Sequence, residues 1–184
     1  MKMIRMFSIA LLCCLAAPVT FAQTQEAPKT LAETYTQILT IAERQIVSAA
    51  EAMPADKYDF APTKAQGDFE GVRTFAQQVK HLTEANYGFF QSWNVPGAVK
   101  REDIEKLTSK DDLVKALKDS YAYAHKAIDT LTPTNYLEAS NFGPAKSTRA
   151  GAAAFAIAHS MDHYGQMVEY LRMNGVVPPA SRKG

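Results

Sequence analysis

The fold is decided by the stretch Phe155-Ala-Ile-Ala-His159-Ser-Met-Asp-His163-Tyr-Gly-Gln-Met-Val-Glu-Tyr-Leu171, whose periodicity predicts one helix. Because His159 and His163 are four residues apart, a helix places them on one face, one above the other. Two stacked imidazoles can direct a ring nitrogen at a single divalent cation. Carboxylate partners would satisfy the same nitrogens, so this pair alone is weak evidence for a metal site. The apolar and aromatic side chains of the stretch 155–171 are Phe155, Ile157, Met161, Tyr164, Met167, Val168 and Leu171.

Residues 1–22 have the features of a signal peptide. Lys2 and Arg5 provide a basic start, an apolar run follows over residues 6–17, and Thr20-Phe21-Ala22 is an acceptable cleavage site. The apolar run is too short for a membrane-spanning helix. We therefore expect cleavage after Ala22, export to the periplasm and no stable membrane anchoring.

Cleavage would leave a mature chain without cysteine, because Cys13 and Cys14 both lie in the removed segment. This excludes disulfides, thiolate metal ligands and cysteine nucleophiles from the mature protein. Losing Lys2 and Arg5 leaves 18 basic residues against 19 acidic ones. Because the sequence has no stripe of basic residues with aromatic residues between them, we expect no nucleic-acid partner.

The mature chain is long enough for one domain with a proper core, expected over residues 30–184 after a flexible leader at 23–29. No alternating strand pattern of useful length occurs, which predicts an all-α protein. Four helices of about twenty residues each indicate an antiparallel-type four-helix bundle. We expect these helices near residues 30–53, 71–93, 110–131 and 149–174, with a connecting loop at 54–69 and a short turn at 104–107.

Local signals mark the ends of several of these helices. Thr30 and Glu33 have the spacing of a capping box at the start of the first helix. Ser109, with Asp112 in the first turn, caps the third long helix. Gly175 suits the C-terminal cap of the last helix. In the first helix the residues that recur at helical intervals are Leu31, Tyr35, Ile38, Leu39, Ile41, Ile46 and Ala49.

The second helix offers a third histidine. His81 lies roughly 100° from the centre of the apolar stripe, at 3.6 residues per turn, on a side shared with small or polar residues. That position faces a groove, and taken alone it favours a partly exposed histidine bonded to water. His125, on the third long helix, lies well off the core side and is expected to be a surface residue. The residues on the same side as His81 are Thr74, Gln78, Ala85, Gly88 and Ser92.

Three segments read together form a larger pattern: Tyr58-Asp-Phe-Ala-Pro62, Val72-Arg-Thr-Phe-Ala-Gln-Gln-Val-Lys-His81-Leu82, and the block from His159 to Pro179. They resemble the DinB family of metal-binding four-helix-bundle proteins, over the chain from the first helix to Pro179. The most specific part is the last block, where HxxxHxGQ continues into YLRxxG and two prolines.

The resemblance implies a site and an architecture. The family pattern has one histidine on the second helix and an HxxxH pair on the last, which here are His81, His159 and His163. This overrides the expectation of a water-bonded His81. The resemblance also implies the DinB/YfiT-like metalloenzyme fold, a long crossover between the second and third helices, and a homodimer.

Three imidazoles leave at least one metal position open for water or substrate, which is the catalytic pattern. We expect a divalent ion, Zn²⁺ or Ni²⁺, that is lost as the pH falls through the ordinary histidine pKa near 6.5. Gln166 and Asp162 lie near the pair and are candidates to orient the rings or the water, Gln166 being the better placed. Tyr164 and Tyr170 are expected to be core aromatics.

The preferred functional hypothesis is a metal-dependent enzyme with hydrolase-type chemistry on an unknown small molecule. Some relatives of the resembled family are metal-dependent thiol transferases or isomerases, but an exported protein loses access to the cytosolic thiol pool. A non-catalytic metal-binding or stress-related bundle is the main alternative, and a bundle with incidental histidines is the third. No phosphate cradle, nucleotide motif or nucleophile elbow is present to name a substrate.

Overall fold

The computed structural model describes residues 26–142 and 146–183. The predicted signal peptide and its cleavage site lie outside these residues. Within them no strand forms, and the β-type pairing is one isolated bridge between Ala139 and Thr148. No helix in this part of the chain has the length and hydropathy needed to cross a membrane. The helices are α1 (Leu31–Ala52), α2 (Phe75–Phe89), α3 (Arg101–Glu105), α4 (Lys110–Ile128) and α5 (Arg149–Met173).

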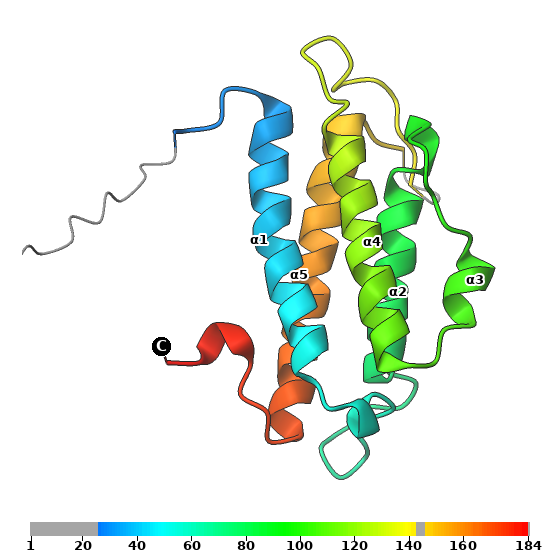
Figure 1. The fold of residues 1–184 in the computed structure, drawn as a ribbon, viewed down its shortest axis with the longest axis vertical. Coiled ribbons are helices and arrows are strands. Elements are labelled where there is room, and N and C mark those ends of the chain that lie inside the picture. Colours follow the sequence, from blue (N-terminus) through cyan, green and yellow to red (C-terminus); the bar gives the residue numbers. More distant parts are fainter. Residues whose placement is uncertain (1–25, 143–145, 184) are drawn as a thin grey trace, which may run out of the picture.

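The four long helices form an all-α bundle in which α4 and α5 each pack against both α1 and α2 (Figure 1). The helices α1 and α5 run in one direction, and α2 and α4 run in the other. The pairs α1/α4 and α2/α5 are therefore antiparallel, whereas α1/α5 and α2/α4 are parallel. A parallel α2/α4 pair requires a link along the side of the bundle, and the segment containing α3 provides it. This is the long crossover that the resemblance implied.

The predicted helix starts are confirmed at three positions. The Thr30 side chain accepts a hydrogen bond from the Glu33 amide, and the Glu33 carboxylate caps the Thr30 amide in return. Ser109 accepts a hydrogen bond from the Asp112 amide at the start of α4. The last helix begins at Arg149, as predicted, with Thr148 as its cap.

Other boundaries differ from the prediction. The helix α2 begins at Phe75, four residues later than expected, because Thr74 and Gln77 form a second capping box. Gly71 lies before the helix with φ +77°, a left-handed conformation that suits glycine. The crossover turn is a helix at 101–105, not at 104–107, and α4 ends at Ile128, not at residue 131.

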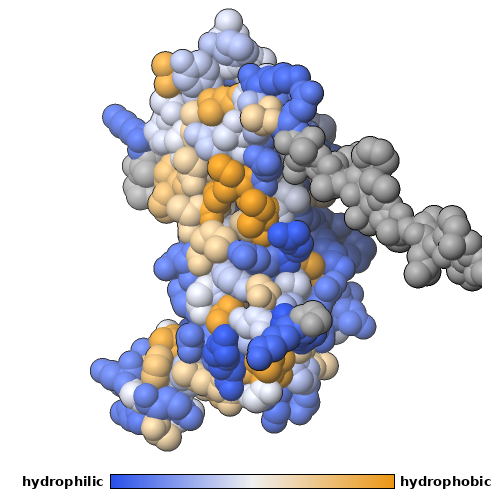
Figure 2. All heavy atoms as spheres, turned by 90° about the vertical axis from the view of Figure 1, so that its left-hand side faces the viewer, coloured by the Kyte–Doolittle hydropathy of each residue, from blue (hydrophilic) through white to orange (hydrophobic). Residues whose placement is uncertain are grey.

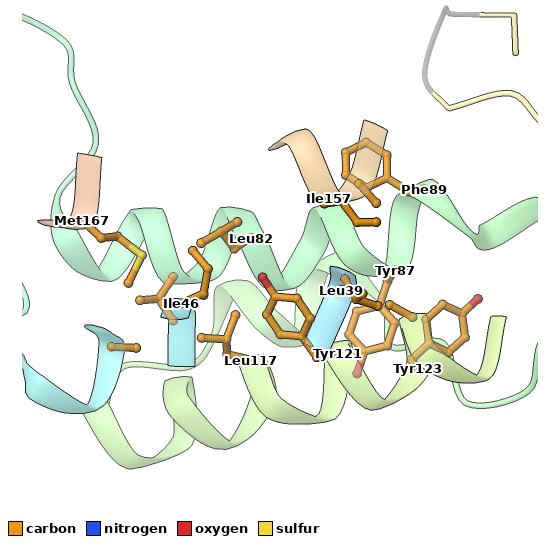
Figure 3. Packing of buried hydrophobic residues seen from close by; sticks show 14 of the residues in the cluster. Leu39, Ile46, Leu82, Tyr87, Phe89, Leu117, Tyr121, Tyr123, Ile157 and Met167 are labelled. Atoms are coloured by element: carbon orange, nitrogen blue, oxygen red, sulfur yellow. The ribbon is translucent and has the colours of Figure 1, made fainter. Parts of the chain in front are cut away.

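The core is built from side chains of all four long helices (Figure 3). Leu39, Leu82, Leu117, Tyr121 and Met167 are fully buried within it.

Some residues expected to be apolar contacts are instead more than a third exposed: Ile38, Ile41, Phe155 and Met161. Figure 2, which views the side of the molecule with α1, shows apolar side chains in the middle of that face. The homodimer stays a prediction.

Two buried polar pairs hold the helices in register. The Asn86 amide donates to the Ser120 hydroxyl at 3.0 Å, joining α2 to α4. The Tyr121 hydroxyl donates to Ser160 at 3.0 Å, joining α4 to α5. Because a buried polar group without a partner is costly, sliding one helix along another would be penalised. The helices that carry the three histidines are thereby fixed relative to one another.

Candidate metal centre

The structure brings His81, His159 and His163 together from two helices. Each offers one ligand atom, and the three atoms all lie within 4.8 Å of one another. Nε2 of His81 and Nε2 of His159 are 3.1 Å apart. Because α2 and α5 pack side by side, His81 near the middle of α2 lies opposite His159 and His163 near the middle of α5.

The rings form a compact triangle. Their centroids are 5.0 Å apart for His81 and His159, 4.8 Å for His81 and His163, and 4.5 Å for His159 and His163. Two nitrogens bound tetrahedrally to Zn²⁺ at roughly 2.0–2.1 Å are about 3.3 Å apart, close to the spacing of the His81 and His159 nitrogens. Neutral imidazoles also suit Ni²⁺, Cu²⁺ and Fe²⁺. The residues present thus fit a divalent metal ion.

Gln78 orients the third imidazole. Nδ1 of His163 lies 2.7 Å from the side-chain oxygen of Gln78, which can only accept a hydrogen bond. The proton of neutral His163 is therefore on Nδ1, and Nε2 keeps its lone pair for a ligand. Gln78 is buried, with 2% of its surface exposed. Sequence reasoning placed Gln78 on the side of His81 but did not assign it to the site.

The hydrogen bonds continue from Gln78 to the surface. Its amide donates to the side-chain oxygen of Gln166 at 2.7 Å, and the Gln166 amide donates to an Asp162 carboxylate oxygen at 3.1 Å. Asp162 is exposed, in keeping with a solvated residue. Gln166 and Asp162, the two residues expected to orient the rings, are thus linked to His163 by hydrogen bonds that pass through Gln78.

Burial keeps the histidines neutral. Desolvation, followed by the Arg73 charge, lowers the pKa of His81 to about 4. Desolvation, followed by the charges of His159 and His81, lowers the pKa of His163 to about 4. Desolvation also lowers the pKa of His159. Because only neutral imidazole binds a metal ion, these lowered pKa values keep the histidines able to bind metal below the pH near 6.5 expected from ordinary histidine.

An aromatic cluster closes one side of the site. Phe89 meets the His159 ring edge-on at a centroid distance of 5.2 Å. Phe142 stacks on Phe155 at 4.7 Å, and both contact Phe89. This contact accounts for the position of Phe155, which covers His159 from outside while 45% of its own surface remains exposed.

The site is reached from the other side, along α2. A cleft of about 630 Å³ lies between α2 and the crossover segment, and it is lined by His81, Ala85, Gly88 and residues 98–102 among others. The small side chains at Ala85 and Gly88 leave this space open, as the pattern around His81 predicted. Neither His159 nor His163 lines the cleft, so a molecule entering it meets the His81 edge of the cluster first.

The remaining candidates lie elsewhere. Nε2 of His125 is 2.9 Å from a Glu43 carboxylate oxygen, at the contact of α4 with α1, and His125 is not part of the histidine cluster. Tyr170 is buried, and its hydroxyl donates to the backbone oxygen of Arg73. Tyr164 is partly buried against the core. Both tyrosines pack as expected from the sequence.

Comparisons with known proteins agree with this architecture. The family model of the DinB superfamily matches residues 38–167. A DinB-like protein from Bacillus cereus ATCC 10987 superposes with a TM-score of 0.68 at 15% identity, covering 80% of this chain and 95% of its own. A DinB-like protein from Bacillus subtilis gives 0.61 at 17% identity, covering 82% and 99%. No curated protein sequence matches the chain.

Proposed function

Because this chain belongs to the DinB superfamily, we propose that it is a metal-dependent enzyme whose divalent ion is held by His81, His159 and His163. The observation that carries the proposal is the approach of the His81 and His159 Nε2 atoms to 3.1 Å, with His163 beside them. A divalent ion held by three imidazoles supplies Lewis acidity, which polarises a carbonyl or lowers the pKa of water to about 7.

The protein's own residues prepare the site for such chemistry. Gln78 holds His163 in the tautomer that leaves Nε2 available. The Phe89 side chain and its aromatic neighbours pack against the His159 side of the cluster. The cleft beside His81 has room for a small molecule, which a purely structural metal site does not require. These features favour a catalytic site over a non-catalytic one.

Hydrolase-type chemistry is the reaction we favour. It needs only water and the metal ion, so it is compatible with the periplasmic location proposed from residues 1–22, where cytosolic thiols are scarce. Mass measurement on a periplasmic extract tests that location. It should find a chain beginning at or near Gln23, and an intact Met1 in the cytoplasmic fraction would contradict export.

The activity itself is tested with a panel of ester, amide and thiol-conjugate substrates. The metal-loaded protein should turn over at least one hydrolysable compound, and chelation or His81→Ala should abolish that turnover. Turnover of thiol conjugates alone would favour the transferase alternative. If the metal-loaded protein acts on none of the three classes, the non-catalytic metal-binding alternative replaces the enzyme.

A further inference from the structure

Charged side chains surround the entrance to the histidine site. The cleft beside His81 adjoins a second hollow of about 430 Å³, and both are lined by His81, Arg73, Glu84 and Arg101. Cationic and anionic groups therefore meet where a molecule would approach the site. The charge that remains available to a ligand depends on which of these side chains already form ion pairs with one another.

Most of the charge on Arg101 is already balanced. Its guanidinium contacts the carboxylates of Glu84 and Glu105, each at 3.3 Å. The Glu84 side chain is only 14% exposed, so this pair ties the crossover helix α3 to α2 at the wall of the cleft. Lys80 is also engaged, because its ammonium donates to the Glu105 backbone oxygen at 2.7 Å.

Arg73 is different. Within residues 26–142 and 146–183 its guanidinium has no ion-pair or hydrogen-bond partner, while its backbone oxygen accepts from Tyr170. It lines both hollows together with His81. An arginine without an ion-pair partner in the described residues therefore shares the lining of the cleft with His81.

We propose that this cleft binds a small monocarboxylate, with the carboxylate on Arg73 and the other end of the molecule at the His81 edge of the cluster. The inference rests on the proposed metal site and names the class of molecule that the site takes. The guanidinium fork matches a carboxylate with two parallel hydrogen bonds. No change in the backbone is needed, since Arg73 already reaches the cleft.

The charges of the cleft favour a carboxylate over a phosphate. The two hollows are lined by three carboxylates and four cationic side chains, which leaves one positive charge in excess, enough for a monoanion but not for a dianion. The carboxylates belong to Glu84, Glu102 and Glu105, and the cations to Arg73, Lys80, Lys100 and Arg101. A single unpaired guanidinium balances one negative charge.

The test uses protein loaded with Co²⁺ and two matched probes, mercaptoacetate and mercaptoacetamide. Both offer the same sulfur to the metal ion, and only the first carries a carboxylate. Changes in the Co²⁺ absorption spectrum give a Kd for each probe. Wild-type protein should bind mercaptoacetate about fivefold or more tightly than the amide, the range expected of a partly exposed charge pair. Arg73→Gln should remove this preference and leave the amide Kd unchanged.

Arg44→Gln is the matched control, because Arg44 is an exposed arginine of α1 that lines a hollow without histidine. It should keep the wild-type preference. Arg73→Gln leaves the Tyr170 hydrogen bond intact, since that bond uses the backbone oxygen. Equal Kd values for the two probes in wild type, or an unchanged preference in Arg73→Gln, would overturn the inference while the metal site stands. If Co²⁺ does not bind at all, the proposed function itself fails, and the inference with it.

Discussion

The side-chain oxygen of Gln78 lies 2.7 Å from Nδ1 of His163, and this contact joins α2 to α5 inside the histidine cluster. The Gln78 amide is fixed in turn by Gln166. His163 is therefore held in one tautomer and one ring orientation before any ligand arrives. Such partners commonly change metal affinity although they never touch the ion.

Replacing Gln78 should weaken metal binding without emptying the site. Gln78→Leu removes the acceptor, and we expect a loss of metal affinity of roughly 10–100-fold. Gln78→Glu keeps an acceptor at the same place and should retain most of the affinity. Competition with a chelating dye measures both variants. Gln37→Leu, at an exposed position of α1, is the control, and equal affinity in Gln78→Leu and wild type would show that the contact is not needed.

Each of the three histidines should matter to a similar degree. His81→Ala, His159→Ala and His163→Ala each leave two ligands, so each should lose most of the metal affinity. His125→Ala should keep it, because His125 pairs with Glu43 outside the cluster. Metal titration of the four variants checks this. A variant of the cluster with unchanged affinity, or a loss in His125→Ala, would mean that the ligand set is wrong.

The metal-free protein should become less stable as the pH falls from 6.5 towards 4. The pKa values of His81 and His163 are lowered from 6.5 to about 4 in the folded protein. Between these values these two histidines bind more protons in the unfolded chain than in the folded one. Their contribution to the free energy of unfolding therefore decreases with falling pH and is fully present only above 6.5.

Urea denaturation of the metal-free protein between pH 4.5 and 7.5 measures this dependence. The triple variant His81→Ala/His159→Ala/His163→Ala should show a flatter profile, because it lacks the groups that titrate. Equal slopes in the two proteins would contradict the lowered pKa values. The carboxylates common to both proteins contribute equally and cancel in the comparison.

Chelation should lower the melting temperature of the metal-loaded protein. An ion present at about 100 times its Kd stabilises the folded state by roughly 2.7 kcal/mol, which is about 5–10 °C for a domain of this size. The triple alanine variant should melt at the same temperature with and without chelator. A calorimetric scan gives both values, and an equal drop in the variant would place the stabilising ion elsewhere.

The sequence predicted the bundle because local signals and periodicity agreed. Thr30, Ser109 and Arg149 mark the starts of their helices as expected. Thr74 and Gln77 have the same spacing as Thr30 and Glu33, and this capping box starts α2 at Phe75, whereas the expectation of a start near residue 71 did not include it. The exposure of Ile38 was unpredictable, because periodicity does not say which side of an apolar stripe faces a neighbour.

The site was predictable only where residues share a helix or match a family pattern. The spacing of His159 and His163 follows from helix geometry. His81 was added by the resemblance, since its helix alone favoured bonding to water. Gln78 and His163 are 85 residues apart, and nothing in either helix by itself indicates that they meet. The relative register of α2 and α5, set by tertiary packing, brings them together.

The central claim is that His81, His159 and His163 hold one divalent metal ion. Elemental analysis of protein purified without a metal-affinity tag, after addition of Zn²⁺ or Ni²⁺ and removal of the excess, tests it most directly. The account predicts about one ion per chain in the wild type and none in the triple alanine variant. Wild-type protein that retains no metal ion, or a triple variant that retains as much as the wild type, would contradict it.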